Sequence, residues 1–249
     1  MRTVRRTVLD GAIILCAALL FAAGLKSCII DAYKIPTASM ESTLHIGDYV
    51  LVNKFIFGAR TPEKFLYIPI PHFRFPALRS IHRGDVIVFE FPGEPNEVIM
   101  VRNLFLVKRC VGLPGDTVDV TEGNVRVNGL RADFFERAKE DFSPVTVPYQ
   151  GMKIVMNERT FNQWKIFIRR EGSTAEFLNG SVVIDGQQTD SYTVKRNYYF
   201  AFGDNINNSA DSRVWGFVPE ENIVGKAMMV YFSKNEQGVQ WSRIGTIVK

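Results

Sequence analysis

The sequence predicts a mainly β protein: an N-terminal transmembrane helix followed by a β-rich core that carries an inserted, smaller β domain. Three features support this prediction. One apolar run lies near the N-terminus, short β-branched segments follow it, and Asn-Gly and Asp-Gly dipeptides at 128–129 and 185–186 are typical of tight hairpins. The expected strands cover residues 49–52, 86–89, 117–120, 181–184 and 227–232.

The composition is that of an ordered globular chain. The 249 residues are 46% hydrophobic and 12% aromatic, which argues against disorder. A formal net charge of +4 is too small to require nucleic acid as a partner, although a slightly basic chain suits an anionic lipid surface. Because no spacing of Cys and His is typical of zinc, we expect neither a metal nor another cofactor.

Three cysteines in the whole chain exclude a disulfide-stapled scaffold. Cys16 lies inside the apolar run, Cys28 just beyond it, and Cys110 far away beside Arg109. A bridge between Cys28 and Cys110 stays open, but three buried or lone thiols are favoured because free cysteine is usually buried.

The start of the chain predicts a membrane anchor. Three arginines within the first six residues precede an uncharged stretch over residues 11–25. Counted over residues 8–30, the segment is just long enough to cross the hydrocarbon of a bilayer. The basic residues ahead of it place the N-terminus in the cytoplasm and the rest of the chain outside. A cleaved secretory signal is equally compatible with this short apolar core, and with the small residues at 22–24.

The composition also divides the chain into parts. Residues 117–198 are more polar than their flanks and less punctuated by Gly-Asp turns, so we expect them to form an insertion. Its one helical pattern, at 132–139, is brief. The expected parts are a cytoplasmic tail (1–7), a transmembrane anchor (8–30), the first part of the core (31–116), the inserted β-rich domain (117–198) and the second part of the core (199–249).

Residues 65–75 are rich in aromatic residues and proline. Aromatic rings favour the membrane interface, so this segment could lie on the bilayer surface. A segment that simply covers the core is slightly favoured over that interpretation.

The first segment with chemical potential covers residues 35–44 and contains Ser39 shortly after a proline. A serine between a small and a large apolar residue is typical of an exposed turn, where most serines only cap or solvate the chain. The segment lacks the glycines two residues on either side of the serine that a nucleophile elbow needs.

The second segment covers residues 107–116 and places Lys108 and Arg109 at the end of an apolar strand. Because both neighbours of this basic pair are apolar, we expect one of the two side chains to point inward. Burial favours the neutral form of a lysine. An arginine stays charged, so only Lys108 could serve as a base.

The third segment covers residues 203–216, where many turn-forming residues surround Asp211 and Arg213. Such a composition predicts a rigid, hydrogen-bonded loop, and loops of this kind position functional side chains. Support of the core is the alternative, and both roles can hold together.

In this order behind an N-terminal anchor, the three segments resemble bacterial signal peptidase I, the membrane-bound serine protease family that removes signal peptides from exported preproteins. The resemblance extends to residues 47–54 and 83–89, and it covers nearly the whole chain from Tyr33 onward. It implies a serine–lysine dyad without a cofactor, acting on preprotein signal peptides at the phospholipid bilayer.

Carried over by position, the resemblance implies a role for each of several residues. Ser39 is the nucleophile and Lys108 the general base. Thr37 and the backbone N–H of Ser39 bind the oxyanion. The remaining roles are the orientation of the lysine by Ser209, the bracing of the loop by Asp211 and Arg213, and the lining of the pockets for small substrate side chains by Tyr33, Ile35 and Val107.

The sequence departs from the family pattern at three positions. Ala38 stands where the family usually has Gly, and Ser42 where it usually has Pro; both changes are small and spare the dyad. Ile206 replaces an arginine, which puts a local salt bridge in doubt.

The resemblance implies a single-pass protein of the bacterial inner membrane, with its catalytic part on the outer side. The resemblance also favours a retained membrane anchor over a cleaved secretory signal. Two alternatives stay open: a peptidase specialised for one exported partner, and an inactive, membrane-anchored β module that only binds.

Overall fold

The computed structural model describes residues 10–11, 13–15, 18, 29–58, 64–65, 68–69, 73–98 and 103–249. The expected anchor at 8–30 falls mostly outside these residues, as do the expected tail, Cys16 and Cys28. Within the described part of the chain, no helix has the length and apolar character needed to cross a bilayer. Cys110 is a buried free thiol.

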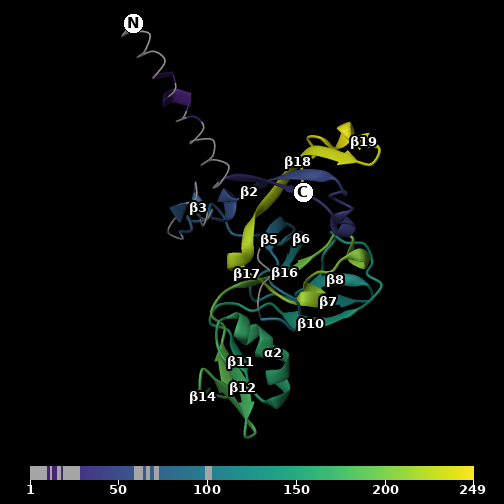
Figure 1. Ribbon diagram of the computed structural model, residues 1–249. Helices are drawn as coiled ribbons and strands as arrows, with labels where there is room; N and C mark the ends of the chain where they lie inside the picture. The colour runs from purple at the N-terminus through teal and green to yellow at the C-terminus, as the bar shows by residue number, and fades with distance from the viewer. Residues whose placement is uncertain are drawn as a thin grey trace.

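The centre of the molecule is an antiparallel sheet of eight strands (Figure 1). Its strand order is β1-β2-β18-β5-β6-β16-β17, with β19 paired to the far end of β18. Strands distant in sequence are therefore neighbours, and the last long strand lies between two early ones. The bounds are β1 Ile30–Lys34, β2 Asp48–Asn53, β5 Val86–Glu90, β6 Phe105–Gly112, β16 Tyr198–Phe202, β17 Val218–Pro219, β18 Ile223–Asn235 and β19 Gly238–Val239.

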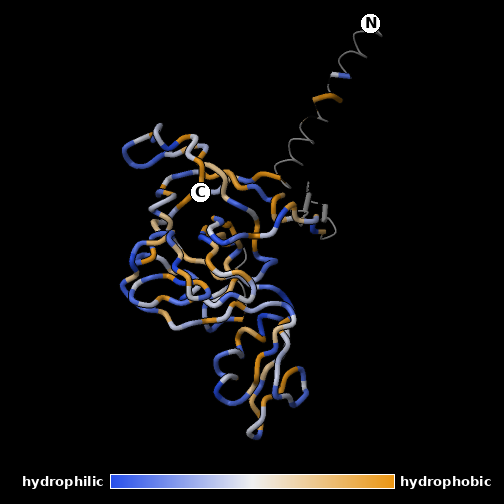
Figure 2. Tube along the Cα trace, turned by 180° about the vertical axis from the view of Figure 1, so that it is seen from behind, coloured by the Kyte–Doolittle hydropathy of each residue, from blue (hydrophilic) through white to orange (hydrophobic). Residues whose placement is uncertain are grey.

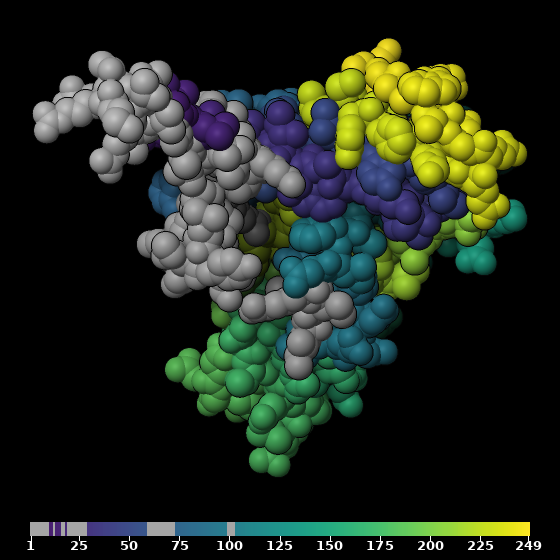
Figure 3. Space-filling model, turned by 45° about the horizontal axis from the view of Figure 1, so that its top comes forward, coloured from purple at the N-terminus to yellow at the C-terminus, as the bar shows by residue number. Residues whose placement is uncertain are grey.

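Residues between β6 and β16 add smaller sheets and one long helix. A four-stranded sheet has the order β10-β7-β8-β9. Of two smaller sheets, one pairs β11 with β15 and the other has the order β12-β13-β14. In Figures 1 and 3, the part with α2 and β12 projects from the end of the molecule opposite β19. The bounds are β7 Thr117–Thr121, β8 Asn124–Val127, β9 Leu130–Arg131, β10 Phe142–Thr146, β11 Lys153–Val155, α2 Glu158–Arg170, β12 Ala175–Leu178, β13 Ser181–Ile184, β14 Gln187–Gln188 and β15 Ser191–Thr193.

Short elements complete the described chain. The 3₁₀ helices are η1 Ala38–Met40, η2 Phe55–Phe57, η3 Ile206–Asn208, η4 Glu220–Asn222 and η5 Trp241–Arg243; the others are β3 Lys64–Phe65, β4 Ile68–Pro69 and the helix α3 Ser212–Trp215.

The mainly β prediction is confirmed, and all five expected strands occur. Both expected hairpins form as well, because Asn128-Gly129 and Asp185-Gly186 each adopt the two positive φ angles that such turns need. Residues 132–139 form turns rather than a helix.

The helix α2 was not expected. Asn157 caps it by accepting hydrogen bonds from the backbone N–H groups of Arg159 and Thr160, and Phe161 and Ile168 bury its inner face. An Asn followed three residues later by Thr, ahead of apolar residues at helical spacing, was the available signal.

Three clusters of buried side chains hold the molecule together. Figure 2 shows hydrophobic stretches along the central strands and hydrophilic ones at the outer loops. One cluster lies under the turn that carries Ser39, where Met40 and Leu44 are fully buried against Val50 and Val230. This packing fixes the turn on the sheet.

In the aromatic segment, Phe73 and Phe75 are 54% and 38% exposed. The side chains from residue 61 to 72 lie outside the described part, so the choice between bilayer contact and core cover stays a prediction.

Candidate active site

Ser39 is the middle residue of η1, which begins at Ala38 directly after the extended residue Thr37 (φ −131°, ψ 158°). The turn is closed by backbone hydrogen bonds from Glu41 N–H to the Ala38 carbonyl and from Leu44 N–H to the Met40 carbonyl. Ser39 is only 9% exposed. The hydroxyl is therefore held in a fixed place at the edge of the core.

Lys108 reaches this hydroxyl from β6. The strand pairs with β5 so that Lys108 lies opposite Ile87 in the interior of the sheet. Its side chain is 4% exposed, and Nζ donates a hydrogen bond of 2.5 Å to Ser39 Oγ. Two residues 69 positions apart thus meet in a site that is largely closed to water.

Burial sets the protonation of this lysine. Loss of hydration lowers the pKa of Lys108 to about 8, although the carboxylates of Asp211 and Asp204 act in the opposite direction. A substantial fraction of the amine is then neutral near pH 8 and can accept a proton.

Arg109 is also buried, with 4% exposure, whereas we expected only one of the two basic side chains to point inward. The reason is an acidic partner. Arg109 donates to both carboxylate oxygens of Asp204, at 2.7 and 2.6 Å, and Thr43 Oγ1 donates to the same carboxylate at 2.5 Å. Sequence reasoning missed this pair; the Gly-Asp dipeptide at 203–204 was its only signal.

Thr37 lies beside the proposed nucleophile, with its Oγ1 3.4 Å from Ser39 Oγ. A hydroxyl here is close enough to the reacting oxygen to serve as a donor to a developing oxyanion.

The loop after β16 holds the Ser39 turn from the other side. Asn205 donates two hydrogen bonds to it, from the backbone N–H to the Ser39 carbonyl (3.1 Å) and from Nδ2 to the Ala38 carbonyl (3.2 Å). A side chain at Gly203 would collide with this arrangement, since an added Cβ would lie 2.4 Å from the Ser39 carbonyl oxygen.

Asp211 and Arg213 form an ion pair within this loop. Arg213 donates to Asp211 from Nε and Nη2, both at 2.8 Å, and from Nη2 to the Ile206 carbonyl at 2.7 Å. Asp211 in turn accepts from the Gly203 N–H at 3.2 Å. Ile206 takes part in this arrangement only through its backbone carbonyl. The effect of having isoleucine instead of arginine at this position stays a prediction.

Ser209 lies close to the dyad without bonding to it. Its buried Oγ has no hydrogen-bond partner within the described residues, and it would lie 2.2 Å from a Cβ at Gly203. The expected hydrogen bond to Lys108 is thus not made in this arrangement, and the orienting role of Ser209 stays a prediction.

The three residues expected to line substrate pockets lie on neighbouring segments. Tyr33 is half-buried on β1 and packs edge-on against Phe105, with ring centroids 5.2 Å apart. Ile35 is 3% exposed in the cluster beneath the Ser39 turn, where the half-buried Val107 packs against it.

Comparison with known proteins places the chain in a family. The model of the family described as "Signal peptidase, peptidase S26" matches residues 8–232. The chain belongs to the signal peptidase family. The chain is therefore a serine peptidase of the bacterial signal peptidase I type.

Individual relatives agree with this placement. Signal peptidase I of Pseudomonas aeruginosa is 33% identical over 238 residues, which cover 90% of this chain and 73% of the relative. That of Pseudomonas fluorescens is 34% identical over 241 residues with the same coverage, and that of Aquifex aeolicus 31% identical over 228 residues, covering 84% of this chain and 78% of the relative.

A crystal structure of a signal peptidase I from Enterococcus faecalis V583 is 25% identical to this chain. The match covers 60% of this chain and 98% of the Enterococcus faecalis chain, with a TM-score of 0.33. The family assignment rests on the sequences.

Proposed function

We propose that the chain is a membrane-anchored serine endopeptidase that cleaves N-terminal signal peptides from exported preproteins after small residues, in the Ala-x-Ala manner. The observation that carries this proposal is the 2.5 Å hydrogen bond between Lys108 Nζ and Ser39 Oγ in a buried site. Membership of the signal peptidase family, and the identity of relatives such as signal peptidase I of Pseudomonas aeruginosa, support the substrate class.

The reaction begins when neutral Lys108 removes the proton of the Ser39 hydroxyl, and Oγ attacks the carbonyl carbon of the scissile peptide bond. A lysine in place of histidine is a known variant of the serine-protease triad. The lysine ammonium then gives its proton to the departing amine, which leaves an ester between Ser39 and the signal peptide. Water, deprotonated by Lys108, hydrolyses that ester and restores the serine.

The negative charge that develops on the substrate oxygen needs donors already in place. We assign this role to the backbone N–H of Ser39 and the hydroxyl of Thr37. Tyr33, Ile35 and Val107 accommodate the small side chains of the substrate, and Ser209 orients the lysine ammonium during the reaction.

The anchor at 8–30 holds enzyme and substrate in the same membrane. Ser39 follows Leu25 by 14 residues, so even an extended chain keeps it within about 50 Å of the outer bilayer surface. A preprotein signal peptide lies in the same bilayer, which raises the effective concentration of one for the other. The N-terminus then faces the cytoplasm and the catalytic part the outer side of the bacterial inner membrane.

The direct test replaces each member of the dyad. We expect Ser39→Ala and Lys108→Met, purified as full chains in detergent, to lose preprotein cleavage and to keep their folded far-UV spectrum. Ser42→Ala, an exposed serine of the same turn, and Lys153→Met, an exposed lysine on β11, serve as matched controls that keep activity. Full activity of either dyad variant would overturn the assignment.

A further inference from the structure

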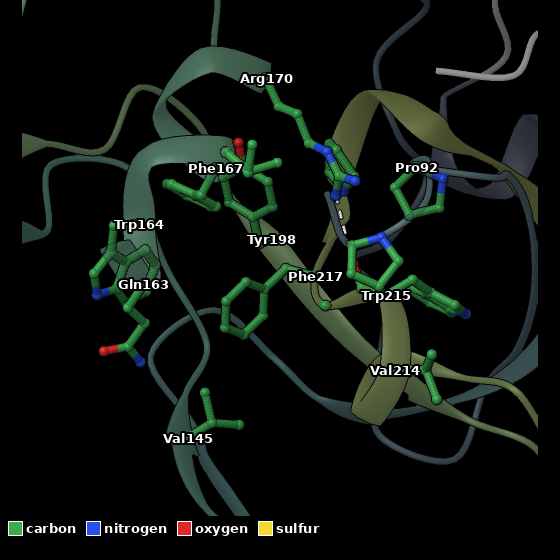
Figure 4. A pocket seen from close by; sticks show the side chains of 14 residues that line it. Pro92, Val145, Gln163, Trp164, Phe167, Arg170, Tyr198, Val214, Trp215 and Phe217 are labelled. Carbon is green, nitrogen blue, oxygen red and sulfur yellow. Dashed lines mark hydrogen bonds between the residues drawn. The ribbon is translucent and has the colours of Figure 1, made fainter. Parts of the chain in front are cut away.

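A cavity lies apart from the dyad, between α2 and residues 214–217 at the end of α3 (Figure 4). Its volume is about 220 Å³. Its walls come from one face of α2, from β16, from residues 214–217 and from the prolines of the loop after β5. The lining does not include Ser39, Thr37 or Lys108, so this cavity is separate from the candidate active site.

The walls are mainly apolar, and five of the fourteen lining residues are aromatic. Trp164 and Phe217 are nearly parallel, at 8° with centroids 6.1 Å apart, and Phe167 packs against Tyr198 at 4.8 Å. Figure 4 shows these rings gathered on one side of the cavity. An apolar cavity of about 150 Å³ already accepts a benzene molecule, so this one has room for a single ring with a short substituent.

Among the described residues that line this cavity, Arg170 is the cation. Arg170 extends from α2 toward Pro92 and Trp215 (Figure 4). Its guanidinium donates to three backbone carbonyls, those of Glu97 (3.0 Å), Trp215 (3.5 Å) and Glu94. A guanidinium has five N–H groups, so two donors remain for a ligand.

The positive charge of Arg170 lacks a direct counter-charge. Within the described residues no carboxylate forms an ion pair with the Arg170 guanidinium. The carboxylates of Glu94 and Glu97 interact with it only at longer range, and both side chains are exposed to solvent. Neutral carbonyls satisfy hydrogen bonds without balancing a charge. An anion entering the cavity would supply what is missing.

The directions of the pKa shifts of the arginines also indicate that Arg170 lacks a direct counter-charge. Burial lowers the pKa of the Arg170 guanidinium, and the nearby acidic groups offset only part of this effect. The pKa values of Arg79 and Arg83 are raised instead, because each donates to a carboxylate. Arg170 is therefore an under-compensated cation beside an apolar cavity.

We propose that this cavity binds a ring-bearing apolar carboxylate of the size of one amino acid, either a free aromatic acid or the C-terminal aromatic residue of a peptide. The ring lies among Trp164, Phe167 and Phe217, and the carboxylate accepts the two free N–H groups of Arg170. Charged hydrogen bonds of this kind fix the orientation of a ligand whose affinity comes mainly from apolar burial.

Tryptophan fluorescence tests the proposal, because two of the three tryptophans, Trp164 and Trp215, line the cavity. The Trp241→Phe variant of the full chain in detergent removes the third signal. Titration with N-acetyl-phenylalanine should give a saturable change in tryptophan fluorescence, with a Kd of about 1 mM. N-acetyl-phenylalaninamide, which lacks the carboxylate, should bind about tenfold more weakly. Equal affinity for the two compounds, or no saturation, would overturn the proposal.

Variants test the role of the guanidinium. Arg170→Gln should weaken the acid about tenfold and leave the amide unchanged, whereas Arg159→Gln, exposed on the same helix, should leave both unchanged. An equal loss from both variants would reduce the effect to general surface charge and contradict the site. If Arg170→Gln does not fold, the comparison of acid with amide still decides.

A final arm separates the two ligand sources. Because an active chain would be expected to cleave after Ala-x-Ala, this arm uses the full chain with both Trp241→Phe and Ser39→Ala. A peptide Ala-Ala-Ala-Phe with a free C-terminus that binds it more tightly than N-acetyl-phenylalanine would assign the cavity to peptide ends. Tighter binding of the free acid would assign it to small molecules. Saturation by neither would refute the proposal.

Discussion

The buried amine of Lys108 carries an energetic cost that depends on pH. Its pKa in the folded chain is about 8, against 10.5 for a lysine in water. The charged form is penalised only in the folded state, so the penalty is complete below pH 8 and disappears as the pH rises above 10.5. A difference of this size corresponds to roughly 3 kcal/mol of stability given up at neutral pH. The rest of the fold therefore offsets the free-energy cost of this buried amine, at the position where the proposed reaction needs a base.

Thr37 gives a test of the oxyanion site. Its hydroxyl lies 3.4 Å from Ser39 Oγ, so replacement by valine removes a donor while keeping the shape of the side chain. We predict that Thr37→Val lowers kcat by about 10²-fold or more with little change in KM, because the donor acts on charge that develops in the transition state. Steady-state cleavage of an Ala-x-Ala peptide measures this.

A matched control for that experiment is Thr193→Val, an exposed threonine on β15, which should keep the original kcat. An unchanged kcat in Thr37→Val would remove this hydroxyl from the mechanism.

At the scale of elements, β6 presents two basic side chains at successive positions. Successive residues of a strand point to opposite faces of the sheet. Lys108 meets the Ser39 turn, while Arg109 meets Asp204 and, through Nη1, the Gly84 carbonyl at 2.7 Å. The strand is thereby joined to the loop that follows β16, and this connection helps to hold Lys108 opposite Ser39.

The buried pair between Arg109 and Asp204 predicts a large effect on stability. Asp204→Asn removes the carboxylate that balances the buried guanidinium of Arg109, so we expect the free energy of unfolding to fall by about 3–5 kcal/mol. The exposed ion pair between Arg131 and Asp133 is the control: Asp133→Asn should change the free energy of unfolding by less than about 0.5 kcal/mol. Denaturant unfolding in detergent measures both; equal, small losses would show that the buried pair does not stabilise the fold.

The elements were predictable where local chemistry decides them. The hairpins at 128–129 and 185–186 follow from residues that tolerate positive φ, and the long strand β18 follows from its run of apolar residues. The helix α2 was missed because eight of its thirteen residues are polar or charged, although its apolar residues recur at helical spacing. Its cap at Asn157 is a signal that only a residue-by-residue search would have found.

At the scale of the whole molecule, the assembly of the site depends on sheet order. The Ser39 turn, β6 and the loop at 203–213 come together only because the sheet places β18 between β2 and β5. The three segments were identifiable from their residues and their resemblance to a family. The pairing of Arg109 with Asp204, and the hold of Asn205 on the turn, depend on this long-range order, so the sequence alone could not supply them.

Attachment to the membrane is a property of the whole chain and gives a further prediction. If residues 8–30 cross the bilayer, as we propose, the full chain should stay in the membrane fraction after alkaline extraction. A chain beginning at residue 31 should be released from that fraction. Reporter fusions should place the N-terminus in the cytoplasm and the C-terminus outside. Release of the full chain by alkali, or a reporter active on the opposite side, would contradict the anchor.

The measurement that tests the mechanism most directly is the titration of Lys108 itself. NMR of the full chain with labelled lysines, with Lys108→Met used to assign the signal, reports the pKa of this one amine. The structure predicts a value of about 8, and kcat/KM should rise with pH through the same value, because only the neutral amine can take the serine proton. A pKa near 10.5, as for a lysine in open water, would contradict the account.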